Sequence, residues 1–423
     1  MEKIELEGLD QICYKETFDN GMVGYFIPYK NKNNYSMHYV TRYGSVDTSF
    51  TIEDKEITVP AGSAHFLEHK KFETKDGIDP FSFAAQSGTD CNAATYYQYT
   101  RYLFQGNKAF KENLDYLLTY VHTPYFTEEN VEKEKGIIIE ELLQYQDLVD
   151  FQLDVLSKEG LLCVHPMRED IGGTVESVKS ITKEDLDILF ETFYQPSNMF
   201  LVITGNFDVE EAINVIKNNK AFNEVSSNKE IIRKKYDEPA NVNFKEKEIK
   251  FNTSSTRLAY SLKIEIPENN DLFKTHLYYS LMLSMLFGVS SDFREKAKKE
   301  ELYTSFFYSK EHLDNYVLIT FVADTEKPNE LVEKIKEEIK NMDLKEEELE
   351  RIKKVWISSE VMMIDNIDMT LDNIVYDVIE YKDIIPNKVP IYRTLNFKEL
   401  TEIISNTNFE NDSKVIIRPK KAD

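Results

Sequence analysis

A helix–strand unit occurs twice in this chain, and its spacing constrains the fold more than any other feature. Residues 182–205 read TKEDLDILFETFYQPSNMFLVITG, where Thr182 and Asp185 are spaced as a capping box that begins a helix before an apolar strand. Residues 396–419 repeat this order, with Asn396 as the cap, at an offset of 214 residues. Because this period is half of a 423-residue chain, it predicts duplication of a whole domain and excludes a stack of short repeats.

The domain organisation follows from this duplication. A chain of 423 residues is too long for a single hydrophobic core. Residues 223–248 are polar and charged without a clear period, which predicts a linker between domains at 1–222 and 249–423. Each half mixes runs of strands with runs of helices. The expected class is therefore α+β, with two similar domains in which helices pack on a mixed or antiparallel sheet.

Local patterns in the first half indicate the order of its elements. Residues 22–28 and 35–42 are rich in β-branched and aromatic residues, and we predict that they form a strand pair. A helix is expected around 63–75, and the alternation in 90–105 predicts a strand. Helical patterns then dominate from 107 to 160.

Composition and charge exclude several classes of protein. The formal net charge of -24 would repel a phosphate backbone, so nucleic acid is not expected as a partner. This acidity fits a solvated surface, or a field that attracts basic peptides. The apolar stretch at 276–289 is shorter than the roughly 20 residues of a membrane span and predicts a buried helix. Three scattered cysteines, no CxxC and no apolar segment at the start predict a cytoplasmic protein.

Residues 64–72, AHFLEHKKF, contain the pattern His-x-x-Glu-His. On a helix, His65 and His69 lie about 40° apart on one face, so both imidazoles can bind one ion. Glu68 lies beside that face and can reach a water molecule without binding the ion itself. This order of residues is the inverted zincin motif. Five residues alone do not decide between a metal site and two histidines on a solvated helix.

A catalytic zinc site needs a third protein ligand and an open position for water, whose pKa zinc lowers to about 7. The segment 127–147, TEENVEKEKGIIIEELLQYQD, predicts a helix with Glu134 and Glu141 seven residues apart. Around the helix axis the two residues are about 20° apart, and along the axis they are roughly 10 Å apart. Either glutamate can be the ligand, and each taken alone also fits a solvated helical face.

Five segments together resemble the M16 (pitrilysin-type, inverzincin) zinc peptidases. They are PAGSAHFLEHKKFE (60–73), GTDCNAATYYQYTRYLF (88–104), VEKEKGIIIEELLQYQD (131–147), HPMREDIGGTVESVKSITKEDL (165–186) and FYQPSNMFLVITGNFD (193–208). The resemblance covers the first half closely and the second half loosely. It implies Zn²⁺ as cofactor, His65, His69 and Glu141 as its ligands, Glu68 as general base and Glu134 as a supporting, activity-linked residue.

The resemblance also implies how substrate is bound. The segment CNAATY (91–96) is expected to be an edge strand that pairs with an extended peptide through main-chain hydrogen bonds. Asn92 and Ala93 are the candidate contacts, although an ordinary sheet strand would have the same sequence. Main-chain pairing selects only weakly for the sequence of the bound peptide. Unfolded peptides or leader segments are therefore the expected substrates.

The second half departs from the family pattern. The two-domain length resembles the M16B group, whose subunits pair as clamshell dimers around a chamber. Self-sufficient members carry an Arg and a Tyr seven residues apart, and here Ala297 and Thr304 occupy those positions. Arg294 and Tyr303 are present but nine residues apart. We therefore expect the zinc subunit of a heterodimer whose partner supplies the pair, or a homodimer. The alternative is a non-proteolytic peptide-binding or scaffold subunit.

Overall fold

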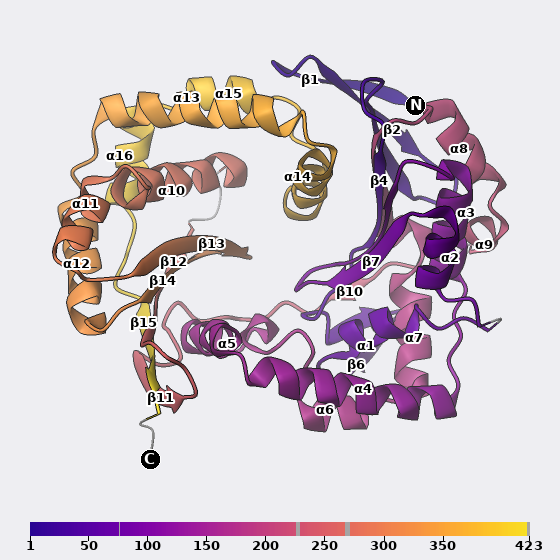
Figure 1. The fold of residues 1–423 in the computed structure, drawn as a ribbon, viewed down its shortest axis with the longest axis horizontal. Helices are drawn as coiled ribbons and strands as arrows, with labels where there is room; N and C mark the ends of the chain where they lie inside the picture. The colour runs from indigo at the N-terminus through magenta and orange to yellow at the C-terminus, as the bar shows by residue number, and fades with distance from the viewer. Residues whose placement is uncertain (76, 226–228, 267–270, 421–423) are drawn as a thin grey trace. The chain divides into compact units, whose positions relative to one another are not determined.

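The computed structural model describes residues 1–75, 77–225, 229–266 and 271–420 of the chain (Figure 1). These residues form two compact units, each built from three separate stretches. Unit 1 comprises Met1–Leu142, Asp170–Lys235 and Ser359–Pro390, and unit 2 comprises Leu143–Glu169, Tyr236–Ser358 and Ile391–Asp423. The units are defined by packing, whereas the predicted ranges 1–222, 223–248 and 249–423 follow the sequence duplication, and we keep those ranges as a proposal.

Unit 1 is built on a seven-stranded sheet. Its order is β1 (Glu2–Leu6), β2 (Gln11–Thr17), β3 (Val23–Pro28), β9 (Met199–Gly205), β4 (Tyr35–Thr41), β8 (Thr100–Gly106) and β7 (Asp90–Thr95). Only the pair β3–β9 is parallel, and the other neighbours are antiparallel. A small sheet joins β10 (Ile232–Arg233), β5 (Ser49–Ile52) and β6 (Lys55–Thr58). The strand β7 is therefore at an edge of the large sheet.

Two local predictions for unit 1 need correction. The strands at 22–28 and 35–42 exist, but they do not pair with each other, because β9 lies between them. Every residue of β9 is buried, so this apolar strand belongs in the middle of the sheet. The region 90–105 is also two strands, because the chain turns back after Thr95 and β7 pairs with β8.

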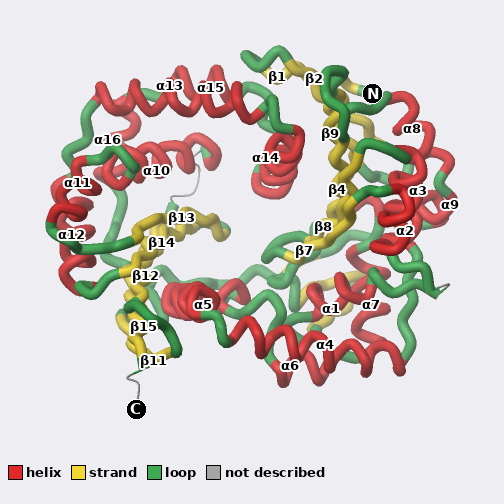
Figure 2. Tube along the Cα trace, in the orientation of Figure 1, coloured by secondary structure: helices red, strands yellow, loops and turns green. Residues whose placement is uncertain are grey.

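Helices cover both faces of this sheet (Figure 2). On one face, α3 (Phe110–His122) packs with Met37 and Tyr39 in the main core of the unit. On the other face, α14 (Ile367–Glu380) packs on Val40 and Phe200 through its apolar stripe. The remaining helices of unit 1 with eight or more residues are α1 (Ser63–Lys70), α2 (Pro80–Ser87), α7 (Lys183–Phe193) and α8 (Val209–Asn218), together with most of α4 (Glu128–Gln146).

Unit 2 repeats the sheet of unit 1 with fewer strands. Its order is β11 (Glu246–Phe251), β15 (Asp412–Pro419), β12 (Arg257–Glu265), β14 (Tyr316–Asp324) and β13 (Ser305–Leu313). The first pair is parallel and the others are antiparallel, as in the series β3–β9–β4–β8–β7. The longer helices are α5 (Val149–Leu161), α10 (Leu272–Phe287), α11 (Asp292–Lys299), α12 (Pro328–Asn341), α13 (Glu346–Met363) and α16 (Phe397–Ser405). The α+β class with two similar units is confirmed.

The caps that revealed the duplication are formed as predicted. The Thr182 side chain accepts a hydrogen bond from the Asp185 amide, and Asn396 accepts one from the Glu399 amide at 2.9 Å. The strands β9 and β15 that follow occupy equivalent places in the two sheets. Among the helices of the described residues, none has both the length and the apolar character needed to cross a membrane.

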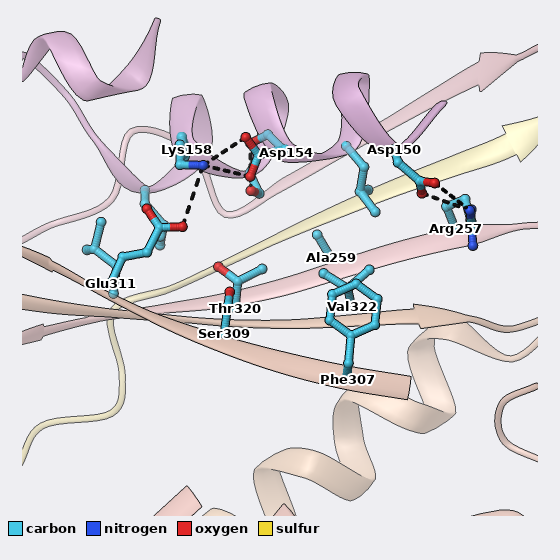
Figure 3. A pocket seen from close by; sticks show the side chains of 14 residues that line it. Asp150, Asp154, Lys158, Arg257, Ala259, Phe307, Ser309, Glu311, Thr320 and Val322 are labelled. Carbon is cyan, nitrogen blue, oxygen red and sulfur yellow. Dashed lines mark hydrogen bonds and ion pairs between the residues drawn. The ribbon is translucent and has the colours of Figure 1, made fainter. Parts of the chain in front are cut away.

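In unit 2, α5 covers β12 and β15 and leaves a cavity of about 220 Å³ over the neighbouring strands (Figure 3). Ion pairs join the helix to the sheet at both ends of this cavity. Asp150 is 2.7 Å from Arg257, and Lys158 is 2.6 Å from Asp154 and 3.6 Å from Glu311. Each charged group on the cavity wall thus takes part in an ion pair, and Lys158 is shared by two carboxylates.

Candidate metal centre

The helix α1 carries the His-x-x-Glu-His pattern and begins at a tightly packed glycine. Its N-cap, Gly62, has a φ of 87°, a left-handed conformation that L side chains adopt at a cost. A Cβ atom there would lie 2.3 Å from the carbonyl oxygen of Gly172. Phe66 and Leu67 are fully buried in the core of unit 1, which fixes the rotation of the helix. The opposite side of α1 therefore presents His65 and His69.

We expect Gly62→Ala to destabilise the fold by about 2 kcal/mol or more, because it combines a strained φ with a backbone clash. A matched control is Gly136→Ala in α4, where an added Cβ would meet nothing within 4 Å. Alanine in this helix interior should stabilise the protein by about 0.5–1 kcal/mol. Thermal and urea unfolding measure both effects, and equal shifts in the two variants would contradict the packing argument.

The structure brings His65, His69 and Glu141 together, as the resemblance implied. One ligand atom from each lies within 4.8 Å of the other two. The carboxylate of Glu141 lies 3.3 Å from His69 Nε2 and 3.9 Å from His65 Nε2. The two imidazole rings are 4.6 Å apart between centroids. Two nitrogens and one oxygen in this arrangement are a donor set that suits Zn²⁺.

Glu134 contacts the back of this donor set. Its Oε1 atom is 3.0 Å from Nδ1 of His69, the nitrogen that faces away from Glu141. A carboxylate in this place orients the ring and makes its other nitrogen a better ligand. Glu134 and Glu141 are seven residues apart on α4, so one helix supplies both a candidate ligand and its support.

The charges around His69 favour a cation at the centre. Burial lowers the pKa of His69, but the hydrogen bond with Glu134 and the nearby carboxylates of Glu68 and Glu141 outweigh it, so that the pKa is raised. Burial, together with His69, lowers the pKa of His65 to about 3, which keeps that ring neutral. A metal ion must displace protons from its ligands, and a neutral imidazole beside clustered carboxylates meets this requirement. The residues therefore fit a divalent metal.

Glu68 lies beside the donor set without joining it. Its side chain is only 8% exposed, and Oε2 accepts a hydrogen bond of 2.7 Å from the Thr95 hydroxyl. Burial raises the pKa of Glu68, and the hydrogen bond from Thr95 opposes this shift. A desolvated carboxylate next to a metal centre is suited to accept and return a proton.

A cavity of about 610 Å³ opens beside these residues. Its wall includes Glu68, His69, Glu134 and Asn92. Asn92 is exposed and Ala93 is partly buried, and both lie on the edge strand β7. The cavity wall thus contains residues of the candidate centre and Asn92 of the strand that was predicted to bind substrate.

Thr95 and Gly62 are two residues whose roles the sequence did not reveal. Thr95 lies inside the predicted substrate strand, but its contact with Glu68 joins residues 27 positions apart. Gly62 was inside a quoted family segment, yet the close approach of Gly172 is not visible in the sequence. In the sequence, the threonine at position 95 and the glycine at position 62 are the only signals of these contacts.

The site combines two imidazoles, a carboxylate from a second helix, a buried carboxylate at their side and an open cavity. These are features that metal-dependent hydrolase centres have in common. The family described as Insulinase (Peptidase family M16) matches residues 54–161, and the Peptidase M16 inactive domain matches residues 180–355. The zinc protease YmfH of Bacillus subtilis, whose function is uncharacterized, is 39% identical over 340 residues, which is 78% of each chain. The chain belongs to peptidase family M16.

Two further relatives extend this comparison. A solved M16-like peptidase of Alicyclobacillus acidocaldarius superimposes with a TM-score of 0.92 at 28% identity, covering 97% of this chain and 99% of that one. A probable mitochondrial-processing peptidase subunit beta of Arabidopsis thaliana is 29% identical over 171 residues, which is 39% of this chain and 32% of the plant protein. The similarity to the Alicyclobacillus protein thus covers the complete fold, and the similarity to the plant protein covers part of the chain.

Proposed function

We propose that this chain is a zinc-dependent endopeptidase that cleaves unfolded peptides or leader segments. The observation that carries the proposal is the convergence of His65, His69 and Glu141, with Glu68 buried beside them. The names of the relatives support zinc and proteolysis, because several are called zinc proteases. His65, His69 and Glu141 would hold the ion, and Glu134 would orient His69.

Zinc supplies, when bound, a Lewis acid that polarises the substrate carbonyl and acidifies water. Glu68 accepts a proton from the attacking water at its carboxylate and then delivers that proton to the departing amine. Its burial favours the protonated form between these two steps, because a desolvated carboxylate is less stable than its neutral acid.

Substrate would pair with the free edge of β7. An extended peptide hydrogen-bonds to the main chain around Asn92 and Ala93, and this places one of its peptide bonds next to the cavity beside Glu68. Such pairing uses backbone groups that every peptide has. Unfolded segments are therefore accepted, whereas folded proteins, whose backbone groups are already paired, are excluded.

The proposal includes a heterodimer in which this chain is the zinc subunit. Ala297, at the position of the family arginine, is fully buried in the core of unit 2. Arg294 donates to the carbonyl oxygens of Phe287 at 3.0 Å and Phe306 at 2.6 Å, so its guanidinium is engaged inside unit 2. Tyr303 donates to the Arg294 carbonyl at 3.2 Å. The plant relative is also named as a subunit, which supports division of labour.

The chain should be assayed alone and with the product of its neighbouring gene, on unstructured fluorogenic peptides with zinc present. We expect slow cleavage by the chain alone and a rate at least about 10²-fold higher for the pair, because oxyanion-stabilising groups contribute about this much. A chelator should abolish both rates. Full activity of the chain alone would reject the heterodimer, and the absence of cleavage in both would reject the peptidase.

We also propose that the protein works in the cytoplasm. Its three cysteines, Cys13, Cys91 and Cys163, are all unpaired, as is usual in a reducing compartment. Fractionation of cells against a periplasmic marker tests this location.

A further inference from the structure

Thr95 is the only side chain that hydrogen-bonds to Glu68 in the part of the chain that the structure describes. Its hydroxyl oxygen is 2.7 Å from Glu68 Oε2. An ionised carboxylate can only accept hydrogen bonds, so Thr95 must be the donor. The Glu68 carboxylate is therefore held by one side-chain hydroxyl, and the backbone of Thr95 gives it a further hydrogen bond from the same residue.

The position of Thr95 is determined by the backbone on both sides of it. It is the last residue of β7 and pairs with Thr100 of β8, whose own hydroxyl donates to the carbonyl oxygen of Tyr43 at 2.9 Å. As a β-branched residue in a strand, Thr95 has few side-chain rotamers. Little conformational entropy is therefore lost when its hydroxyl donates to Glu68.

The turn after Thr95 is anchored as firmly as the strand before it. The amides of Ser45 and Val46 donate to the carbonyl oxygens of Tyr96 and Tyr97, each at 3.0 Å. This close approach requires glycine at position 44, where a Cβ atom would lie 2.3 Å from the Tyr97 carbonyl oxygen. The end of the hairpin is therefore fixed to the segment at residues 44–46.

We propose that Thr95 is a positioning residue that holds the Glu68 carboxylate in the orientation needed for proton transfer. The inference rests on the proposed peptidase function for its kinetic consequence. Thr95 belongs to the same edge strand that would pair with substrate, so one rigid element sets the places of both the peptide and the base. The terminal torsion of glutamate is broad when nothing fixes it, which is why a single hydroxyl has a large effect.

The test compares Thr95→Val with Thr95→Ser in the full-length, zinc-loaded protein, with its partner where the partner is required. Valine keeps the shape and removes the donor, so kcat should fall roughly 10- to 100-fold while KM changes less than about twofold. Serine keeps the donor and should restore kcat to within about threefold of the original. Zinc content and zinc affinity should not change in either variant, because Thr95 contacts no ligand of the centre.

Thr204→Val is the matched control for losing a buried hydroxyl. Thr204 lies in β9 of the same sheet, and its hydroxyl donates to the carbonyl oxygen of Ile367 at 2.9 Å. It should lower the melting temperature as much as Thr95→Val does, without a change in kcat. The proposal is overturned if both valine variants retain the same kcat, if serine fails to restore it, or if KM rises while kcat is unchanged.

A structural readout separates this inference from the proposed function. In a crystal structure of Thr95→Val, the Glu68 carboxylate should adopt a new or mixed orientation while His65, His69 and Glu141 stay in place. That result supports the positioning role even if no peptide is hydrolysed by the original protein. An unchanged Glu68 carboxylate would overturn it whatever the kinetics.

Discussion

Replacing Glu68 with glutamine is expected to reduce peptide hydrolysis by roughly 10²- to 10⁴-fold, the range that general acid–base catalysis contributes. Glutamine has nearly the same size and can still accept the Thr95 hydrogen bond at its amide oxygen. It cannot take a proton from water at pH 7. Because Glu68 is not in the donor set of His65, His69 and Glu141, the variant should bind zinc as the original protein does.

Glu73→Gln is a suitable control for this experiment. Glu73 lines the same cavity and has a half-exposed carboxylate paired with Lys70, so its replacement removes an equal charge from the same region. Initial rates on an unstructured peptide and metal analysis are measured for both variants. A similar loss of rate in both would show that the field of the cavity matters and that Glu68 has no special role.

The grouping of the candidate site residues was more predictable from sequence than the sheet that holds them. His65, Glu68 and His69 lie within one helical turn and a half, where local geometry decides which side chains share a face. Glu141 needed the family resemblance, because helical spacing alone allowed Glu134 equally well. In the structure, Glu141 approaches both imidazoles, while Glu134 contacts only the outer nitrogen of His69.

Features that depend on distant segments escaped prediction. The strand pair at 22–28 and 35–42 failed because β9, more than 150 residues later, is inserted between β3 and β4. The hydrophobic pattern of a strand shows which of its faces is buried, but it does not show which strand pairs with it. The hairpin in 90–105 was missed because its turn, at Tyr96–Tyr99, consists of three tyrosines and a glutamine and has no glycine or asparagine.

Two helices pack on the sheet formed mainly by the other half of the sequence. This arrangement also depends on contacts between distant segments, so it was not predicted. The helix α5 comes from the first half and packs on the unit 2 sheet, where Leu153 and Leu156 contact Val415 and Ile417. The helix α14 comes from the second half and packs on the unit 1 sheet. An apolar stripe on a helix shows that it must be covered, and tertiary contacts alone decide by which sheet.

Replacing Glu141 with glutamine should weaken zinc binding by more than about 100-fold, because it removes one of three charged or basic ligands. The adjacent Glu140→Gln is an unusually close control: it changes the next residue of the same helix, where the side chain is exposed to solvent. Glu134→Gln should have an intermediate effect of about 10- to 100-fold, since Glu134 acts on the metal only through His69.

Competition with a fluorescent zinc chelator measures these three affinities without any need for catalysis. The expected order of zinc affinity places Glu140→Gln close to the original protein, Glu134→Gln below it and Glu141→Gln lowest. If Glu134→Gln lost more affinity than Glu141→Gln, the assignment of ligand and supporting residue would have to be reversed. The 3.3 Å contact of Glu141 with His69 Nε2 and its approach to His65 argue against that reversal, because only Glu141 faces both nitrogens that can share one ion.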